Sequence, residues 1–193
     1  MTHRAYQVSI AIAAVAAAAC SKPTQDHGAN AQSNATAAAP TPKPSASAKA
    51  LGPPQLGYCH GGGCSWSREA DRLVIRQDGR GRLIRLTLLG GFSDDMDATV
   101  QWNARAQDVY VFCSTRLPAV MLHTENGWQV DAIDFVAGVP GVLMSSAAIY
   151  ARTCHGREFL EPEEAAGLGY KTLPEDVAEV RVDRPEQIFE KAG

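Results

Sequence analysis

The feature that most constrains this chain is a pair of tight-turn dipeptides, Asp78-Gly79 and Asn126-Gly127, each lying between two strand-like segments. Both dipeptides suit type I′ turns, whose two central residues need positive φ, and such turns join neighbouring antiparallel strands. The flanking segments, all rich in β-branched and other apolar residues, are 72–77, 82–89, 119–124 and 128–135. The sequence therefore predicts two β-hairpins in the middle of the chain.

Further segments extend this pattern towards the C-terminus. Residues 98–103 and 108–114 predict a third hairpin, and 177–182 predict a short strand. Segment 143–152 fits either a strand or a helix. Short helices are expected at Pro162–Gly167, where proline begins and glycine ends the segment, and at 185–191.

Together these elements predict a mainly β, β-rich α+β fold: an antiparallel meander or small barrel-like sheet with one or two short C-terminal helices. Parallel βαβ units are not expected, since the crossover helices that they need are missing. One sheet face has to be covered, and segment 143–190 is expected to cover it or to close a barrel. We place this domain at 56–193.

The beginning of the chain predicts an export signal rather than a structural element. Arg4 supplies a positive charge, and the segment Val8–Ala19 is apolar. This stretch is shorter than the roughly twenty residues that span a bilayer, and it matches the apolar core of a secretory signal peptide. Residues 1–19 are therefore expected to be removed on export.

The end of that stretch, Ala17-Ala18-Ala19-Cys20, resembles the lipobox of bacterial lipoproteins. In that family small residues precede an invariant cysteine, which carries diacylglycerol on its sulfur and becomes the new N-terminus. The resemblance implies lipidation of Cys20 with acyl chains such as palmitate and, because Ser21 rather than Asp follows, an outer-membrane anchor facing the periplasm. Alanine stands at position 17 where leucine is usual, so cleavage by an ordinary signal peptidase, giving a secreted or free periplasmic protein, is the alternative.

Residues 20–55 are expected to form a disordered tether behind the lipidated cysteine. Between Ser21 and Ala50 the sequence contains no Leu, Ile, Val or aromatic residue. Such a segment cannot bury enough apolar surface to offset the entropy that ordering it would cost. It is expected to act as a spacer between the membrane and the domain.

The expected domain contains four cysteines, at positions 59, 64, 113 and 154. An even number of cysteines in an exported domain indicates disulfides, and four cysteines allow three pairings. We favour Cys59–Cys64, which closes a loop of His60 and three glycines, together with Cys113–Cys154, which ties a strand to the later covering segment.

The repeated triplets Cys59-His60-Gly61 and Cys154-His155-Gly156 permit a second interpretation. Thiolate and imidazole bind zinc or copper, and a disulfide in a glycine-rich loop can exchange. However, neighbouring side chains on a strand point to opposite faces, and an oxidising compartment favours stable disulfides. We therefore expect structural disulfides, with neither a metal nor another cofactor.

The remaining polar clusters fit structural roles better than chemical ones. The acidic group at Asp94, Asp95 and Asp97 lacks the spacing of a calcium-binding loop and predicts a solvated turn. The arginines at 72, 76, 80, 82 and 85 predict a solvated sheet face, balanced by Glu69, Asp71 and Asp78. A surface for anionic lipid or glycan is the alternative for these arginines.

Three tryptophans and one histidine are the remaining candidates for a site. Trp66, Trp102 and Trp128 are expected in the core, with stacking on sugars or a partner interface as the alternative. His123 has no nucleophile fixed beside it, and Ser145-Ser146 has no neighbour that would activate a hydroxyl. No catalytic residue is expected.

These observations favour a membrane-anchored envelope lipoprotein that serves as a non-enzymatic binding or structural module. Residues 56–193 carry 14 basic and 20 acidic side chains, a balance that disfavours nucleic acid. The expected partners are the membrane, through the lipid anchor, and a protein or a cell-wall glycan. The alternative is a periplasmic redox or metal-binding protein that uses Cys59, His60 and Cys64 together with Cys154 and His155.

Overall fold

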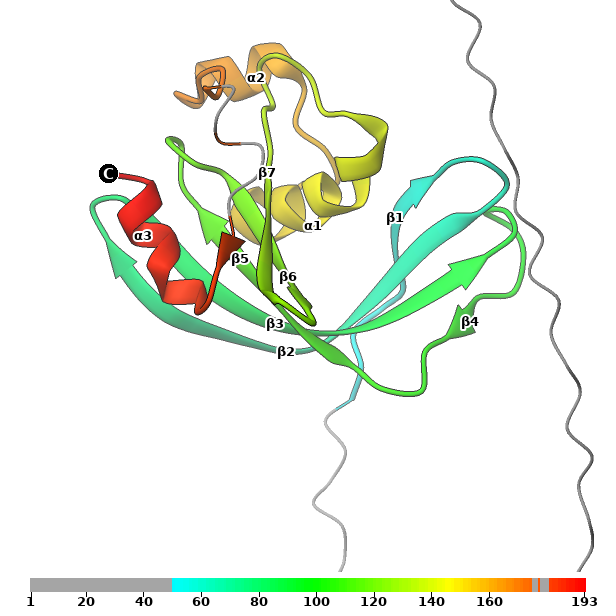
Figure 1. Cartoon of the computed structure of the whole chain (residues 1–193). Coiled ribbons are helices and arrows are strands. Elements are labelled where there is room, and N and C mark those ends of the chain that lie inside the picture. Colours follow the sequence, from blue (N-terminus) through cyan, green and yellow to red (C-terminus); the bar gives the residue numbers. More distant parts are fainter. Residues whose placement is uncertain (1–49, 175–176, 178–180) are drawn as a thin grey trace, which may run out of the picture. The chain divides into compact units, whose positions relative to one another are not determined.

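The turn after Asp78 joins the two longest strands of the computed structural model, β2 (Cys64–Asp78) and β3 (Gly81–Ser93), so the predicted hairpin is confirmed. The expected type I′ turn is wrong, because the two linking residues are Gly79 and Arg80 and neither has positive φ. This hairpin is longer than expected, because β2 begins well before the predicted segment 72–77. Two register shifts within β2 mark β-bulges. Bulges bend and twist a strand pair, and Figure 1 shows β2 and β3 as one long curved ribbon.

The structure describes residues 50–174, 177 and 181–193, which belong to the compact unit Ser45–Gly193. The expected signal peptide, Cys20 and the expected tether up to residue 49 lie outside the described residues. The described strands form one antiparallel sheet in the order β1-β2-β3-β5-β6-β7-β8, and β4 pairs with β3. The mainly β, antiparallel fold is thus confirmed. The remaining strands are β1 (Gln55–Cys59), β4 (Gln101–Trp102), β5 (Gln107–Cys113), β6 (Ala119–Thr124), β7 (Gly127–Ala132) and β8 (Arg181–Val182).

The hairpin predicted from 98–103 and 108–114 is wrong. β4 and β5 do not pair with each other; both pair with β3, β4 through Gly91 and Phe92 and β5 through residues 82–88. The chain reverses before β4, where Asp95 accepts two backbone N–H groups in a tight turn. From there it runs back along β3, and the Asn103 N–H donates to the Gly90 carbonyl between the two strands.

The ambiguous segment 143–152 is helical. The single turn η1 (Gly141–Leu143) leads into α1 (Met144–His155), which ends at Gly156 in the left-handed conformation, with φ of 67°. The two predicted short helices are present as α2 (Pro162–Gly167) and as the pair η3 (Pro185–Gln187) and α3 (Ile188–Lys191). No helix of the described residues is long and apolar enough to cross a membrane.

Different parts of the chain cover the two faces of the sheet, and the second face is covered only in part. Alternate residues of a strand point to opposite faces, and Ile84 and Val111 accordingly pack on one face whereas Leu83 and Phe112 pack on the other. The first face is covered by α1, α2 and the loops around them, as expected for the segment 143–190. The second face is covered by α3 and its neighbours, through Ile188, Phe189 and Ala192 among others.

The favoured disulfide pairing is confirmed. Cys59–Cys64 joins the ends of β1 and β2 around the glycine loop, and Cys113–Cys154 joins β5 to α1. In the chain-entropy model a disulfide stabilises the fold by restricting the unfolded chain, and the effect grows with the length of the closed loop. The sequence separations are 41 residues for Cys113–Cys154 and 5 residues for Cys59–Cys64.

Removal of the two disulfides is therefore expected to have unequal effects. The double variant Cys113→Ala/Cys154→Ala should lose about 4 kcal/mol of unfolding free energy, and Cys59→Ala/Cys64→Ala about 2 kcal/mol. Urea unfolding followed by far-ultraviolet circular dichroism measures both under identical conditions. An equal or larger loss in the Cys59/Cys64 variant would contradict the assigned roles of the two bonds.

Candidate functional site

The second face of the sheet is only partly covered, and a band of polar and aromatic side chains lies beyond the reach of α3. Cross-strand neighbours point to the same face. Arg85 is the neighbour of Tyr110, Thr87 of Asp108, and His123 of Trp128. We call these six residues, contributed by β3, β5, β6 and β7, the open face.

The open face arises because α3 is short. Its four residues and the preceding turn η3 cover Leu83, Phe112, Met121 and Val130, which are all almost fully buried. One or two positions further along the same strands the side chains are half-buried or exposed. The face continues onto β2, where Leu73 lies across from Arg85 and is 48% exposed.

Trp128 is the centre of this surface. Its ring meets the Tyr110 ring edge to face at a centroid distance of 4.8 Å and an interplanar angle of 83°. The His123 ring lies 5.0 Å away at 77°. Such T-shaped contacts fix ring orientation and stabilise a pair by about 0.5–1.5 kcal/mol beyond the burial of area. Trp128 is therefore held in a defined orientation although it is not fully covered.

A hollow of about 520 Å³ lies beside Trp128, lined by Ala106, Gln107, Asp108 and His123 as well as the indole. Oδ1 of Asp108 accepts a 2.7 Å hydrogen bond from the Thr87 hydroxyl. Among the described residues, Asp108 Oδ2, the Gln107 amide, the His123 imidazole and the Trp128 indole N–H have no partner, and the indole N–H is open to solvent. Four polar groups are thus free to bind a ligand around one aromatic ring.

Charge at the open face is nearly balanced. The guanidinium group of Arg85 lies 3.7 Å from an Asp71 carboxylate oxygen, and its Nε is buried without a partner. The pKa of Tyr110 is raised, first by burial and next by the charge of Asp108, against the opposing effect of Arg85. Tyr110 therefore stays protonated at neutral pH, and its hydroxyl remains a hydrogen-bond donor. The hollow itself contains no Lys or Arg.

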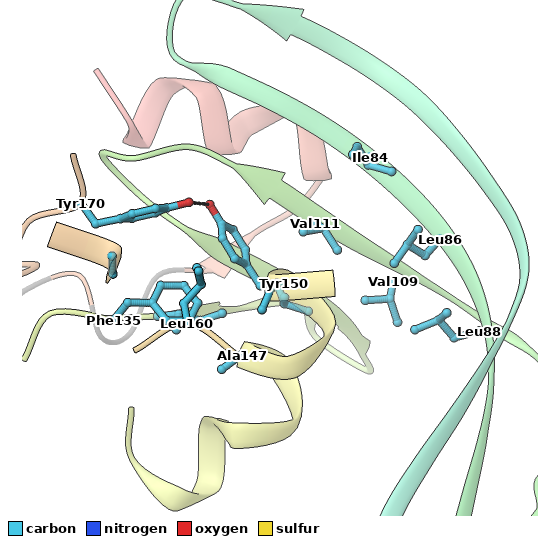
Figure 2. Packing of buried hydrophobic residues seen from close by; sticks show 14 residues of the cluster. Ile84, Leu86, Leu88, Val109, Val111, Phe135, Ala147, Tyr150, Leu160 and Tyr170 are labelled. Carbon is cyan, nitrogen blue, oxygen red and sulfur yellow. Dashed lines mark hydrogen bonds between the residues drawn. The ribbon is translucent and has the colours of Figure 1, made fainter. Parts of the chain in front are cut away.

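The most connected polar network of the first face lies inside the core and leads to His155. The hydroxyl groups of Tyr150 and Tyr170 lie 2.8 Å apart (Figure 2), and Nε2 of His155 lies 2.7 Å from the Tyr170 hydroxyl. The Tyr150 hydroxyl also accepts from the backbone N–H of Ser114 and lies 3.1 Å from the Ser114 carbonyl oxygen. Burial is the first cause that raises the pKa of both tyrosines. The network joins α1 to the end of β5 and has the character of a structural link.

The two Cys-His-Gly segments do not come together as a site. His60 is exposed and stacks on Tyr58, whereas His155 belongs to the tyrosine network. Within 50–174, 177 and 181–193 there is no group of three or more His, Cys, Asp or Glu side chains placed to hold a metal ion. All four sulfurs are in disulfides, and Cys64 is only 2% exposed, which limits attack by an external thiol at that sulfur.

The other predicted clusters have structural partners. Arg72, Arg76 and Arg80 pair with Glu69 or Asp78, so the expected balanced, solvated surface is confirmed. The acidic group of the predicted turn is exposed, with Asp95 ordering the reversal before β4. The pKa of Asp78 is lowered to about 2, chiefly by hydrogen bonds from Arg80.

The tryptophans and serines are placed as follows. All three tryptophans are partly buried, and Trp128 packs against the core of the second face, so the expectation of core positions holds only in part. Trp66 donates its indole N–H to Ser93, and Trp102 lies under the guanidinium group of Arg68. Ser145 bonds to Ser65, and Ser146 donates to the buried Asp131, so both serines tie α1 to the sheet.

Sequence reasoning singled out His123 and Trp128 but missed the residues beside them. Gln107 and Asp108 begin β5, and Tyr110 follows on the same face as Asp108. The available signal was the alternation of polar Asp108 and Tyr110 with apolar Val109 and Val111. That alternation indicates two different faces, but not which face lacks a cover.

Comparison with known proteins identifies no relative: no family model, no curated protein and no solved structure matches this chain. The open face and its hollow are therefore interpreted from their own chemistry.

The tyrosine network yields a stability prediction. Tyr150→Phe should lower the unfolding free energy by about 1–3 kcal/mol, because it leaves the buried Ser114 N–H without an acceptor. Tyr170→Phe should cost less, because Tyr150 keeps its contacts with Ser114 and the half-buried His155 can reach water. Urea unfolding of the two variants compares them directly. An equal or greater loss in Tyr170→Phe would show that Ser114 does not depend on Tyr150.

His155 yields a prediction of pH dependence. Its pKa is lowered from 6.5, first by burial and then by the charge of Arg157. The unfolded chain therefore binds more protons than the folded chain as the pH falls below about 6.5, so stability is lost in that range. His155→Gln should flatten the fall in melting temperature between pH 7.5 and 5.5, whereas the exposed His60→Gln should not. Identical slopes in wild type and His155→Gln would contradict this assignment.

Proposed function

We propose that the protein is a membrane-anchored envelope lipoprotein that works as a non-enzymatic binding module. Export removes residues 1–19, a lipid on Cys20 anchors the chain at the outer membrane, and segment 20–55 spaces the domain from the membrane. The domain then meets an envelope partner, a protein or a cell-wall glycan, through the open face.

The hollow beside Trp128 is the observation that carries the binding role. Ligand sites are concave, combine aromatic surface with a few well-placed polar groups, and fall in the range of about 300–1,000 Å³. The hollow has this size and composition, and four of its polar groups have no partner among the described residues. Tryptophan, tyrosine and arginine are also the residues that contribute most to interfaces, and the open face contains one of each.

Binding fits the open face better than catalysis does. A general base needs a positioned hydrogen bond to the group it serves. His123 is oriented only by its ring contact with Trp128, and no described side chain is hydrogen-bonded to its imidazole. Among the described residues, the one short serine–carboxylate contact, Ser146 to Asp131, is buried and joins α1 to β7.

In-cell photocrosslinking tests whether the open face is occupied. A benzophenone amino acid at Gln107, which lines the hollow, should give crosslinked adducts in intact cells after irradiation. The same amino acid at Leu168, exposed at the end of α2, serves as the matched control. Trp128→Ala should remove most of the adduct at Gln107, because the ring at the centre of the surface is lost.

The same cells report on the anchor. Mass spectrometry of the N-terminal peptide should find diacylglycerol on Cys20, and Cys20→Ala should abolish both the lipid and the Gln107 adduct. Adducts at Gln107 no stronger than those at Leu168 would overturn the binding role. An unmodified N-terminus within the alanine run would overturn the anchor.

A further inference from the structure

We infer that the hollow on the open face is a binding site for an uncharged glycan, with one sugar ring seated against Trp128. This inference rests on the proposed function, because a location in the cell envelope is what brings a glycan within reach of the domain. It names the class of ligand, whereas the proposed function leaves protein and glycan partners open.

The unpaired groups of the hollow match hydroxyl groups. A hydroxyl both donates and accepts hydrogen bonds. Oδ2 of Asp108 accepts, the Trp128 indole N–H donates, and the amide of Gln107 and the ring of His123 each do both. Neighbouring hydroxyls on a sugar ring present alternating donors and acceptors of this kind. A ligand rich in hydroxyls therefore satisfies all four groups at once.

The aromatic part of the hollow suits the other side of a sugar. The C–H bonds on one face of a pyranose form an apolar patch, and such a patch packs on an aromatic ring. Tyr110 and His123 hold the Trp128 ring by edge-to-face contacts, so little rotamer freedom is lost when a ligand packs on it. The site combines one fixed ring with polar groups beside it, the two kinds of surface that a sugar ring has.

The same groups count against an apolar protein anchor. The pockets that dominate protein interfaces are filled by desolvated side chains. An apolar side chain in this hollow would bury four polar groups without partners, and each such burial costs about 1–3 kcal/mol. Of the five lining residues only Ala106 has no polar atom in its side chain.

Charge counts against an anionic ligand. No Lys or Arg is among the described residues that line the hollow, and Asp108 places a carboxylate inside it. Arg85, on the same face, lies beside Asp71. The segment 56–193 as a whole has more acidic than basic side chains, and like charges repel across such a surface. Phosphate-rich, sulfated or nucleic-acid ligands are therefore disfavoured relative to a neutral glycan.

The test uses full-length protein in detergent, labelled with 5-fluorotryptophan and observed by fluorine NMR. The chain has three tryptophans, so single Trp→Phe variants assign the three signals. Titration with the neutral trimers of N-acetylglucosamine and of glucose should shift the Trp128 signal in a saturable way. The Trp66 and Trp102 signals should stay in place, and a sulfated oligosaccharide should cause no shift.

Calorimetric titration with whichever trimer binds then measures how much each side chain of the hollow contributes to the affinity. Gln107→Ala and Asp108→Ala should each weaken binding about tenfold, since each removes a hydrogen-bonding group that contributes about 1.4 kcal/mol. Trp128→Ala should abolish binding. Trp102→Phe changes a half-exposed tryptophan outside the hollow and should leave the affinity unchanged, which makes it the matched control.

The inference is overturned if neither trimer moves the Trp128 signal up to its solubility limit, if the sulfated oligosaccharide binds more tightly, or if binding survives in Trp128→Ala. Digestion of the crosslinked adduct distinguishes failure of the glycan inference from failure of the proposed binding function. An adduct at Gln107 that protease destroys and a glycan hydrolase leaves intact would keep the binding module and reject the glycan. Release of the adduct by the glycan hydrolase would support both.

Discussion

Strand β3 is the constraint on which the rest of the structure depends. Its even-numbered residues from Ile84 to Leu88 build the core under α1, and Leu83 on the opposite side is fully buried under α3. A strand that is apolar on both sides requires two covering layers. It also pairs with β2 along one edge and with both β4 and β5 along the other. The other described strands either pair with β3 directly or are joined to it through the strands that do.

The two covers differ in how firmly they are attached, and this difference determines where a site can form. The helix α1 is bound to the sheet by the Cys113–Cys154 disulfide, by Tyr150 at Ser114 and by Ser146 at Asp131. The cover on the second face is attached without a disulfide, by apolar packing, by the guanidinium groups of Arg76 and Arg80 over the Phe189 ring, and by a hydrogen bond from Arg80 to the Phe189 carbonyl. The first face is therefore covered by α1 and its neighbours, whereas on the second face the cover stops before the open face.

Local signals in the sequence predicted the hairpins and short helices. They failed where the structure depends on pairing between strands that lie far apart in the sequence. Asp78-Gly79 and Asn126-Gly127 marked two hairpins that do form, but the expected type I′ turns are wrong. The linking residues are Gly79-Arg80 and Glu125-Asn126, and none of these four has the positive φ that a type I′ turn needs. Strand β1 was missed because it pairs with the first part of β2, which itself lies before the predicted segment 72–77. β4 pairs with Gly91 and Phe92, beyond the predicted end of β3 at residue 89, and β5 pairs with residues 82–88. No short window of sequence contains either pairing. The helix α1 stayed ambiguous because its buried positions include Ser146, Ala147 and Ala148, whose small side chains leave little hydrophobic periodicity.

The candidate site was predictable only in part for the same reason. His123 and Trp128 were noticed as residue types, but their meeting with Asp108 depends on the register of three strands. Polar side chains on an uncovered sheet face can be explained by solubility, since an exposed apolar band there would promote aggregation. Solubility alone explains the exposed Arg72, which is paired with Glu69. It does not explain why a partly buried tryptophan is held in a defined orientation beside three other side chains with unpaired polar groups. A soluble surface needs charge, whereas a binding surface needs unused hydrogen-bonding capacity in a fixed arrangement, and the hollow has the second property.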